Sequence, residues 1–424
     1  MDLLPRTYRL LLKPGRERSL NLRHSWIYSG AVDVVESLED AQPGDLGDVL
    51  TAGGDVLGVA TVNPASQIAG RVLVWGRAHV DRSWLVRRLS EAWRLRQEIV
   101  DRSRFDAFRW IHGEGDALPG LVVDVYGRFL AVQTPSLFWH RNMETLATAL
   151  AEISGALGVV QKMEGAVRDP QVPGGFRCVA GLEPPGRLEI REGDVRLLVD
   201  LAAGQKTGLY LDQRENRDRL ARLGAGRDVL VAFAYTGSFG LHAAAAGARK
   251  VVFVETSEPA LDLMRENFAR NGIEDAKVEV HREDAWSYMR RETSRFDLII
   301  VDPPALAKAS RHVPRAARGY KDINLHAIRR LAPAGWLATF SCSQHVSADL
   351  FQKILFGASL DAGVPLRCVE RLGPPRDHPV ALDHPQGDYL KGMLLRAASE
   401  SGDEPAAEPS VRSMMPEATE GSSA

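Results

Sequence analysis

Cysteine is scarce in this sequence, and the spacing of its cysteines argues against two kinds of stabilised fold. The chain of 424 residues contains three, Cys178, Cys342 and Cys368. Three cysteines are too few for a disulfide framework, and the absence of a C-x-x-C pair argues against a zinc site. We therefore predict no bound metal and a reducing compartment, which makes the cytoplasm the expected location.

Long apolar segments are absent as well. No run of 18 apolar residues could span a membrane, and the N-terminus lacks the pattern of a secretory signal peptide. Hydrophobic residues make up 45% of the chain and charged residues 25%, which is typical of a globular protein. We expect no membrane partner, and the length favours two or three domains.

The net charge is only −2, but it is unevenly distributed. Residues 398–424 carry six acidic side chains and one arginine, a net charge of −5, which leaves +3 for residues 1–397. This segment is rich in Ser, Pro, Ala and Glu, so we predict a disordered acidic tail. The remainder of the chain is mildly basic.

A nucleotide-binding unit is present without the glycine repeat of dinucleotide-binding proteins. Residues 227–257 read as strand, tight turn, helix and strand, the size of one βαβ unit. The turn has only Gly237 and Gly240 in place of G-x-G-x-x-G, so a pyrophosphate cradle is not expected. Glu255 follows Gly237 by 18 positions, close to the spacing of an acid that binds ribose hydroxyls. A nucleoside cofactor without phosphates, such as S-adenosylmethionine, fits this pattern.

Polar residues recur where the strands of the second half end. After residue 201 strands and helices alternate, which predicts an α/β fold with a doubly wound sheet that binds ligands at the carboxyl ends of its strands. Asp284 could accept a hydrogen bond from an adenine amino group, and two prolines stiffen the turn that carries Asp302. Upstream, Asp212 is expected to cap a helix that starts near Gln213. The candidates for the methionine end of the cofactor are Gln205, Lys206 and Thr207.

Cys342 has two readings. A free cysteine after a buried strand is most often a small core residue. At the carboxyl end of its strand, near Asp302, it could instead attack a pyrimidine ring as a thiolate. Such a thiolate needs a nearby base or positive charge, and the unranked candidates are His345, Lys308, Arg318 and Lys321. Ala305 stands where enzymes that methylate exocyclic amino groups commonly have an aromatic residue, which favours methylation of a ring carbon.

The N-terminal part is predicted to be a small β-domain over residues 6–76, and after its first strand comes a basic loop, Lys13 to His24. This loop is either a solvated surface or a phosphate-contacting edge for nucleic acid. We expect Trp26 and Tyr28 to be core residues. The phrase R-H-S-W-I-Y-S-G resembles the PUA domain, a small RNA-binding β-barrel. The residues that would contact RNA are Lys13, Arg16, Arg18, Arg23 and His24.

The middle of the chain reads as a spacer. Residues 81–103 are predicted to form one helix with many arginines. These arginines either form its solvent-exposed face or contact RNA. Residues 104–200 predict a small α+β domain with a helix over 137–156, and His112 in its glycine-rich turn is expected to be structural. The predicted domains are 1–78, 79–200 and 201–397, followed by the tail 398–424.

Together the later motifs resemble the ribosomal RNA large-subunit methyltransferase I family. They are F-A-Y-T-G-S-F, V-E-T-S-E-P-A-L, D-P-P, R-G-Y-K-D-I-N and F-S-C-S, with G-Q-K-T-G-L-Y-L-D-Q-R-E-N upstream. The resemblance covers residues 6–396 and implies a PUA domain, a class I S-adenosylmethionine-dependent methyltransferase fold and 5-methylcytosine formation in 23S rRNA. It implies that Cys342 is the nucleophile and Asp302 its partner. The residues it places on the cofactor are Phe233, Tyr235, Thr236, Gly237, Ser238, Glu255, Asp284, Ala285, Gln205 and Gln213.

Two other functions stay open at this stage. One is methylation of a guanine nitrogen in rRNA, which needs no thiol. The other is a ribosome-assembly factor that binds RNA and cofactor without turnover. The oligomeric state is open too, and a homodimer is one alternative.

Overall fold

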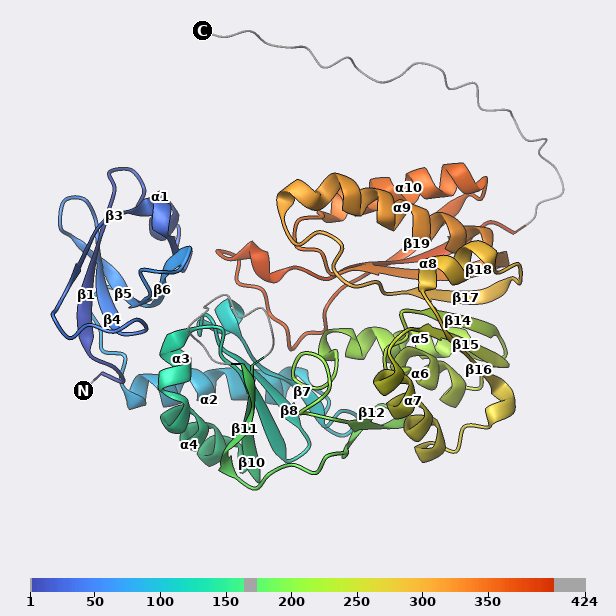
Figure 1. Cartoon of the computed structure of the whole chain (residues 1–424), viewed down its shortest axis with the longest axis horizontal. Coiled ribbons are helices and arrows are strands. Elements are labelled where there is room, and N and C mark those ends of the chain that lie inside the picture. The colour runs from blue at the N-terminus through green and yellow to red at the C-terminus, as the bar shows by residue number, and fades with distance from the viewer. Residues whose placement is uncertain (1, 164–173, 400–424) are drawn as a thin grey trace, which may run out of the picture.

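The computed structural model describes residues 2–163 and 174–399, and in this part of the chain four β-sheets of six, five, two and seven strands follow one another. Figure 1 shows the N-terminal sheet at one end, the central sheet below the middle and the largest sheet at the other end. The tail predicted to be disordered lies outside the described residues from position 400 onward. Among the described residues, no helix is long and apolar enough to cross a membrane.

The N-terminal sheet has six strands in the order β2-β6-β5-β4-β1-β3. Its core is apolar, with Leu10, Ile27 and Val49 fully buried. Trp26 and Tyr28 were expected in this core, and that prediction is wrong. Trp26 is partly exposed and Tyr28 is 47% exposed, because β2 is an edge strand. The elements are β1 (Arg6–Leu12), α1 (Arg18–Asn21), β2 (Trp26–Tyr28), β3 (Val32–Ser37), β4 (Leu46–Leu50), β5 (Val56–Val62) and β6 (Ile68–Trp75).

The central sheet has five strands in the order β11-β10-β9-β8-β7, with α2 and α4 packed against it. The helix predicted over residues 137–156 is two helices, which meet at Asn142, where the amide Nδ2 donates to the carbonyl of Phe138. The elements are α2 (Arg82–Ile99), β7 (Ala107–His112), β8 (Val122–Tyr126), β9 (Phe129–Gln133), α3 (Leu137–Arg141), α4 (Met143–Ser154), β10 (Gly158–Met163) and β11 (Gly175–Gly181).

One arginine of α2, Arg96, does not lie on the solvent-exposed face of the helix. Arg96 is fully buried and forms a two-pronged ion pair with Asp116, at 2.5 and 2.7 Å. Its guanidinium also donates to the carbonyl of Asp377, 3.0 Å away. This arginine therefore joins the central domain to the C-terminal part of the chain and is not available to RNA.

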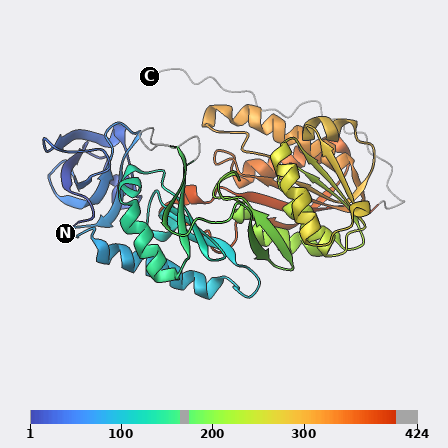
Figure 2. The same ribbon diagram turned by 60° about the horizontal axis from the view of Figure 1, so that its bottom comes forward.

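The largest sheet has seven strands in the order β16-β15-β14-β17-β18-β20-β19, and β20 runs antiparallel to both of its neighbours. Residues alternate between its faces: Val229 and Val231 of β14 pack toward α5, α6 and α7, whereas Leu230 and Ala232 pack toward α8, α9 and α10. Figure 2 shows the two helical layers on opposite sides of the strands. The parallel βαβ arrangement predicted from the sequence is confirmed.

The helices and strands of this domain mostly match their predicted ranges, with α9 starting eight residues before the helix predicted from residue 321. The elements are α5 (Arg214–Gly224), β14 (Asp228–Ala232), α6 (Ser238–Ala245), β15 (Lys250–Glu255), α7 (Glu258–Arg270), β16 (Val278–Arg282), α8 (Ala285–Arg291), β17 (Phe296–Val301), α9 (Val313–Arg329), β18 (Leu331–Ser341), α10 (Ala348–Ala362), β19 (Leu366–Leu372) and β20 (Lys391–Ala397).

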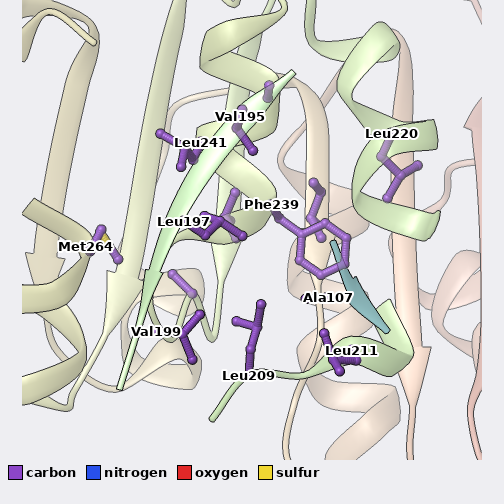
Figure 3. Packing of buried hydrophobic residues seen from close by; sticks show 14 of the residues in the cluster. Ala107, Val195, Leu197, Val199, Leu209, Leu211, Leu220, Phe239, Leu241 and Met264 are labelled. Carbon is purple, nitrogen blue, oxygen red and sulfur yellow. The ribbon is translucent and has the colours of Figure 1, made fainter. Parts of the chain in front are cut away.

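A hairpin connects the central domain to this sheet. It consists of β12 (Leu188–Glu192) and β13 (Val195–Val199). Figure 3 shows Val195, Leu197 and Val199 packed against Phe239 and Leu241 of α6. The hairpin thus shares the core on one face of the large sheet and holds α6 in place.

The segment between β19 and β20, residues 373–390, reaches from the large sheet toward the N-terminal domain (Figure 1, red). Asp377 anchors it, since its buried carboxylate accepts from Arg214 at 2.6 Å and from the backbone N–H of Arg109 at 2.8 Å. At the far end His384 lies against Trp26, with 4.5 Å between the ring centroids. This segment therefore contacts all three domains.

Candidate active site

A cavity of about 520 Å³ lies at the carboxyl ends of β14, β15, β17 and β18, and we call it the rim cavity. A doubly wound sheet places its ligand at this edge. The volume is within the range of small-molecule sites. The residues that line it include Gln205, Lys206, Tyr210, Asp212, Gln213, Phe233, Tyr235, Ser238, Glu255, Asp302, Ala305, Cys342 and Tyr389.

The turn after β14 has a strained backbone, as turns at ligand sites often do. Phe233 and Tyr235 have φ angles of 60° and 51°, a left-handed conformation that non-glycine residues seldom adopt. Gly237 follows at φ 77° and leads into α6. The backbone N–H of Tyr235 donates to Oε2 of Glu255 at 2.7 Å. The turn and the acid at the end of β15 are thus fixed against each other.

Asp284 and Ala285, both predicted to contact the cofactor, lie outside the rim cavity. Asp284 is exposed and caps α8, accepting from the backbone N–H of Ser287 at 2.9 Å. Ala285 follows it as the first residue of that helix. Neither residue lines the rim cavity, and neither do Thr236 and Gly237, which are buried in the turn. Their roles toward the cofactor stay predictions.

Asp212 does not cap a helix as expected, because its side chain points into the rim cavity. It is buried, and Oδ2 accepts from Nζ of Lys206 and from the hydroxyl of Tyr389, both at 2.6 Å. Oδ1 is buried and has no hydrogen-bond partner among the described residues. A buried carboxylate oxygen without a donor is costly, so this atom is positioned to receive a donor from a ligand.

Asp302 is an acid whose proton affinity is raised. Burial raises its pKa to about 7, and the negative charge of Asp212 adds to this rise. Nε2 of Gln213 donates to Oδ2 of Asp302 at 3.1 Å, which orients the carboxyl group. Near neutral pH this side chain can therefore act as a proton donor in the cavity.

Cys342 is partly buried at the end of β18, and its Sγ lies 3.9 Å from the carbonyl oxygen of Pro303. Burial raises the pKa of its thiol to about 11, with a further rise from the charge of Asp302. The positive charge of Lys206 acts in the opposite direction and lowers the pKa. Lys206, which lines the same cavity, and Lys391, whose ammonium group donates to the carbonyl of Ser343, are the cations coupled electrostatically to this thiol.

The four cations considered from the sequence lie elsewhere. His345, Lys308 and Arg318 are exposed, and Lys321 is paired with Asp361 at 2.7 Å. None of them lines the rim cavity. Sequence reasoning assigned Lys206 only to the cofactor, and it missed Tyr389, which is 177 positions from Asp212 in the chain. No local pattern could have revealed that contact.

The residues present fit S-adenosylmethionine. Glu255, which the sequence predicts to bind the ribose, lines the rim cavity, and the buried Oδ1 of Asp212, which has no hydrogen-bond partner among the described residues, suits an ammonium group. The turn after β14 lacks the glycine repeat that cradles phosphates. The fold and the site therefore define a class I S-adenosylmethionine-dependent methyltransferase.

Comparison with known proteins agrees with this class and narrows it. A family model described as S-adenosylmethionine-dependent methyltransferase matches residues 139–396, and a PUA-like domain model matches residues 10–75. Ribosomal RNA large subunit methyltransferase I of Erwinia tasmaniensis is 40% identical over 398 residues, which cover 92% of this chain and 99% of the relative. The protein of the same name from Alteromonas mediterranea is 35% identical with equal coverage. The chain belongs to the ribosomal RNA large-subunit methyltransferase I family, and its methyl donor is S-adenosylmethionine.

Solved structures show the same fold. A putative S-adenosylmethionine-dependent methyltransferase from Streptococcus mutans superposes with a TM-score of 0.78 at 20% identity, covering 92% of this chain and 99% of that one. A putative methyltransferase complexed with SAH superposes equally well. The order of sheets and domains is therefore shared beyond close relatives.

Proposed function

We propose that this methyltransferase forms 5-methylcytidine in large-subunit ribosomal RNA, with Cys342 as the nucleophile and Asp302 as its acid partner. The observation that carries the proposal is the pair itself: a thiol and a carboxyl group with a pKa near 7 line one cavity beside the cofactor site. The relatives carry the rRNA substrate in their names. Ala305 lines the same cavity and provides no aromatic face for an exocyclic amino group.

The proposed chemistry uses both side chains in turn. The Cys342 thiolate bonds to C6 of cytosine, the C5–C6 double bond opens, and N3 takes the proton of Asp302. This makes C5 a nucleophile. S-adenosylmethionine, when bound, supplies a methyl group on a sulfonium as the electrophile. Methyl transfer to C5 leaves S-adenosylhomocysteine. A base then takes the C5 proton, the sulfur–C6 bond breaks with its electron pair leaving on sulfur, and N3 returns its proton to Asp302, which restores the Cys342 thiolate and the aromatic ring.

A substrate analogue that stops the reaction at the covalent adduct tests this mechanism. Ribosomal RNA carrying 5-fluorocytidine has fluorine in place of the C5 proton, so the adduct cannot resolve after methyl transfer. We expect a protein–RNA complex that survives denaturing electrophoresis and requires S-adenosylmethionine. Methylation of ordinary rRNA without any such complex would argue against the covalent step.

Glu255→Ala is expected to weaken S-adenosylmethionine binding by roughly 1.5–3 kcal/mol, the scale of a hydrogen bond to a charged group. The carboxylate now accepts from the backbone of Tyr235, Thr256 and Ser257, so part of the loss would come from a loosened turn. Calorimetry measures the affinity, and Glu266→Ala, at an exposed position of α7, is the matched control. An unchanged affinity in Glu255→Ala would reject its ribose role.

The basic loop is expected to supply RNA affinity without taking part in the chemistry. Arg16, Arg18 and Arg23 are exposed, and the guanidinium of Arg23 lies over the Trp75 ring at 5.0 Å. Replacing all three by Ala should raise the RNA dissociation constant and flatten its salt slope by roughly two to three units, since each phosphate contact contributes about 0.7–0.9. Filter binding of rRNA across a salt series gives the slope.

The control variant removes three positive charges from another part of the surface. Arg270, Arg282 and Arg291 are exposed arginines of the methyltransferase domain, each in a surface ion pair. Their triple Ala variant should keep the parent's slope. If the loop variant also keeps it, the loop is only a solvated surface.

A further inference from the structure

A second cavity reaches Cys342 from another direction. It has a volume of about 440 Å³, and it shares Cys342 and Tyr389 with the rim cavity. We call it the junction cavity, because all three domains contribute to it. Its walls include Trp26 and Arg71 of the N-terminal domain, His112 and Glu114 of the central domain, and His384 and Gln386 of segment 373–390.

One wall of the junction cavity is aromatic. The ring centroids of Trp26 and His384 lie 4.5 Å apart, with an angle of 66° between the planes. The indole N–H of Trp26 donates to Oε1 of Glu114 at 2.6 Å, which fixes the ring. Fixed aromatic rings are the platforms on which proteins stack unpaired bases.

The cavity also has polar groups suited to a nucleotide. Arg71 is a buried cation on one wall. Oε1 of Gln386 is a buried acceptor with no hydrogen-bond partner among the described residues. A nucleotide offers a complement to each of these features: a base face, amino donors on the base edge and a phosphate.

The position of the cavity connects two regions already assigned to RNA. His24, the last residue of the basic loop, lies 4.9 Å from the ring of His384 and 6.1 Å from that of Trp26. Cys342 lies at the other end. A strand whose phosphates lie along the loop would pass this cavity before its target base reaches the thiol.

We infer that the junction cavity holds the nucleotide adjacent to the target cytidine, unpaired and stacked on the Trp26–His384 wall. The inference rests on the proposed function and adds to it the form of the substrate, which is a single-stranded segment with at least two unstacked nucleotides. The junction between the domains then selects the RNA, while the rim cavity carries out the transfer.

Photochemical cross-linking tests this placement on the unaltered protein. Ribosomal RNA fragments in which the nucleotide on either side of the methylated cytidine is replaced by 4-thiouridine are irradiated with the enzyme and an unreactive cofactor analogue, and the joined peptides are mapped by mass spectrometry. We expect cross-links at Trp26 or within residues 381–389. Cross-links confined to other surfaces would overturn the inference.

The KM for rRNA of variants with substitutions at two residues that line the junction cavity provides an independent test. Trp26→Ala removes the platform and should raise KM for rRNA about 5- to 150-fold, the range of one lost base stack. Trp26→Phe should recover most of the loss. Ala381→Trp fills the cavity instead and should raise KM without removing any contact to Glu114. Phe356→Ala, at an exposed aromatic residue on α10, is the control and should match the parent.

The outcomes separate this inference from the proposed function. S-adenosylmethionine affinity should stay within a few-fold in every variant, since none of the altered residues lines the rim cavity. If the parent makes no 5-methylcytidine, the proposed function fails. If the parent is active and both Trp26→Ala and Ala381→Trp keep its KM, the proposed function stands and the junction cavity is not the nucleotide site.

Discussion

Cys342→Ala is expected to abolish methyl transfer to rRNA, with a fall in rate on the order of 10³-fold or more, as when other nucleophiles are removed from covalent mechanisms. S-adenosylmethionine affinity should change by no more than a few-fold, because Cys342 follows β18 while the turn predicted to contact the cofactor follows β14. The measurements are single-turnover methylation and calorimetry. The complex with 5-fluorocytidine rRNA should be absent in this variant.

The other two cysteines provide the controls for this variant. Cys178 and Cys368 are both exposed and free, and neither lines the rim cavity. Their Ala variants should methylate at the parent's rate and should still form the 5-fluorocytidine complex. Retained transfer in Cys342→Ala would contradict the covalent mechanism, whatever the controls show.

Asp302→Asn is expected to slow methylation by about 10²- to 10⁴-fold, the usual value of a general acid. In the parent, the pKa of Asp302 is about 7 and that of Cys342 about 11. The active form needs the acid protonated and the thiol ionised. The rate constant kcat/KM should therefore rise tenfold per pH unit below about 7 and then level off, because above pH 7 the gain in thiolate is offset by loss of the Asp302 proton. In Asp302→Asn the levelling near pH 7 should disappear.

The same variant should make the thiol more reactive. The charge of ionised Asp302 raises the pKa of Cys342, so its removal lowers that pKa and increases the thiolate fraction. At pH 8 to 9 Asp302→Asn should be alkylated at Cys342 by iodoacetamide faster than the parent, although it methylates more slowly. Asp349→Asn on the surface of α10 should change neither rate. Slower alkylation in Asp302→Asn would mean that Asp302 activates the thiol as a base, contrary to the proposed role.

The sequence predicted the methyltransferase sheet well because its strands are short, apolar and separated by helices. Strands predicted around Val229–Val231 and Val251–Val254 are β14 and β15 in the structure. Glu255, Asp302 and Cys342 lie at strand ends because parallel strands bring their carboxyl ends to one edge. These three residues do line one cavity, whereas Asp284, which the sequence predicted at the same edge, does not line it.

Contacts between segments that are distant in the chain could not be predicted from the sequence pattern. Periodicity indicates which face of an element is buried, and it carries no information on what another domain places against it. Arg96 looked like one of several wet arginines on α2, yet Asp116 and Asp377 enclose it. Trp26 looked like a core residue of a small barrel, yet it lies against segment 373–390. Asp212 looked like a helix cap, yet Lys206 and Tyr389 hold it in the cavity.

The most direct test of the central claim is the nucleoside that the enzyme makes. Large-subunit rRNA from a strain lacking the gene is incubated with the purified protein and S-adenosylmethionine labelled in its methyl group, digested to nucleosides and analysed by mass spectrometry. The account predicts label in 5-methylcytidine, and none when the protein is Cys342→Ala. Label in a methylguanosine would contradict the assigned chemistry, and binding of rRNA and cofactor without any labelled nucleoside would contradict enzymatic function on this RNA.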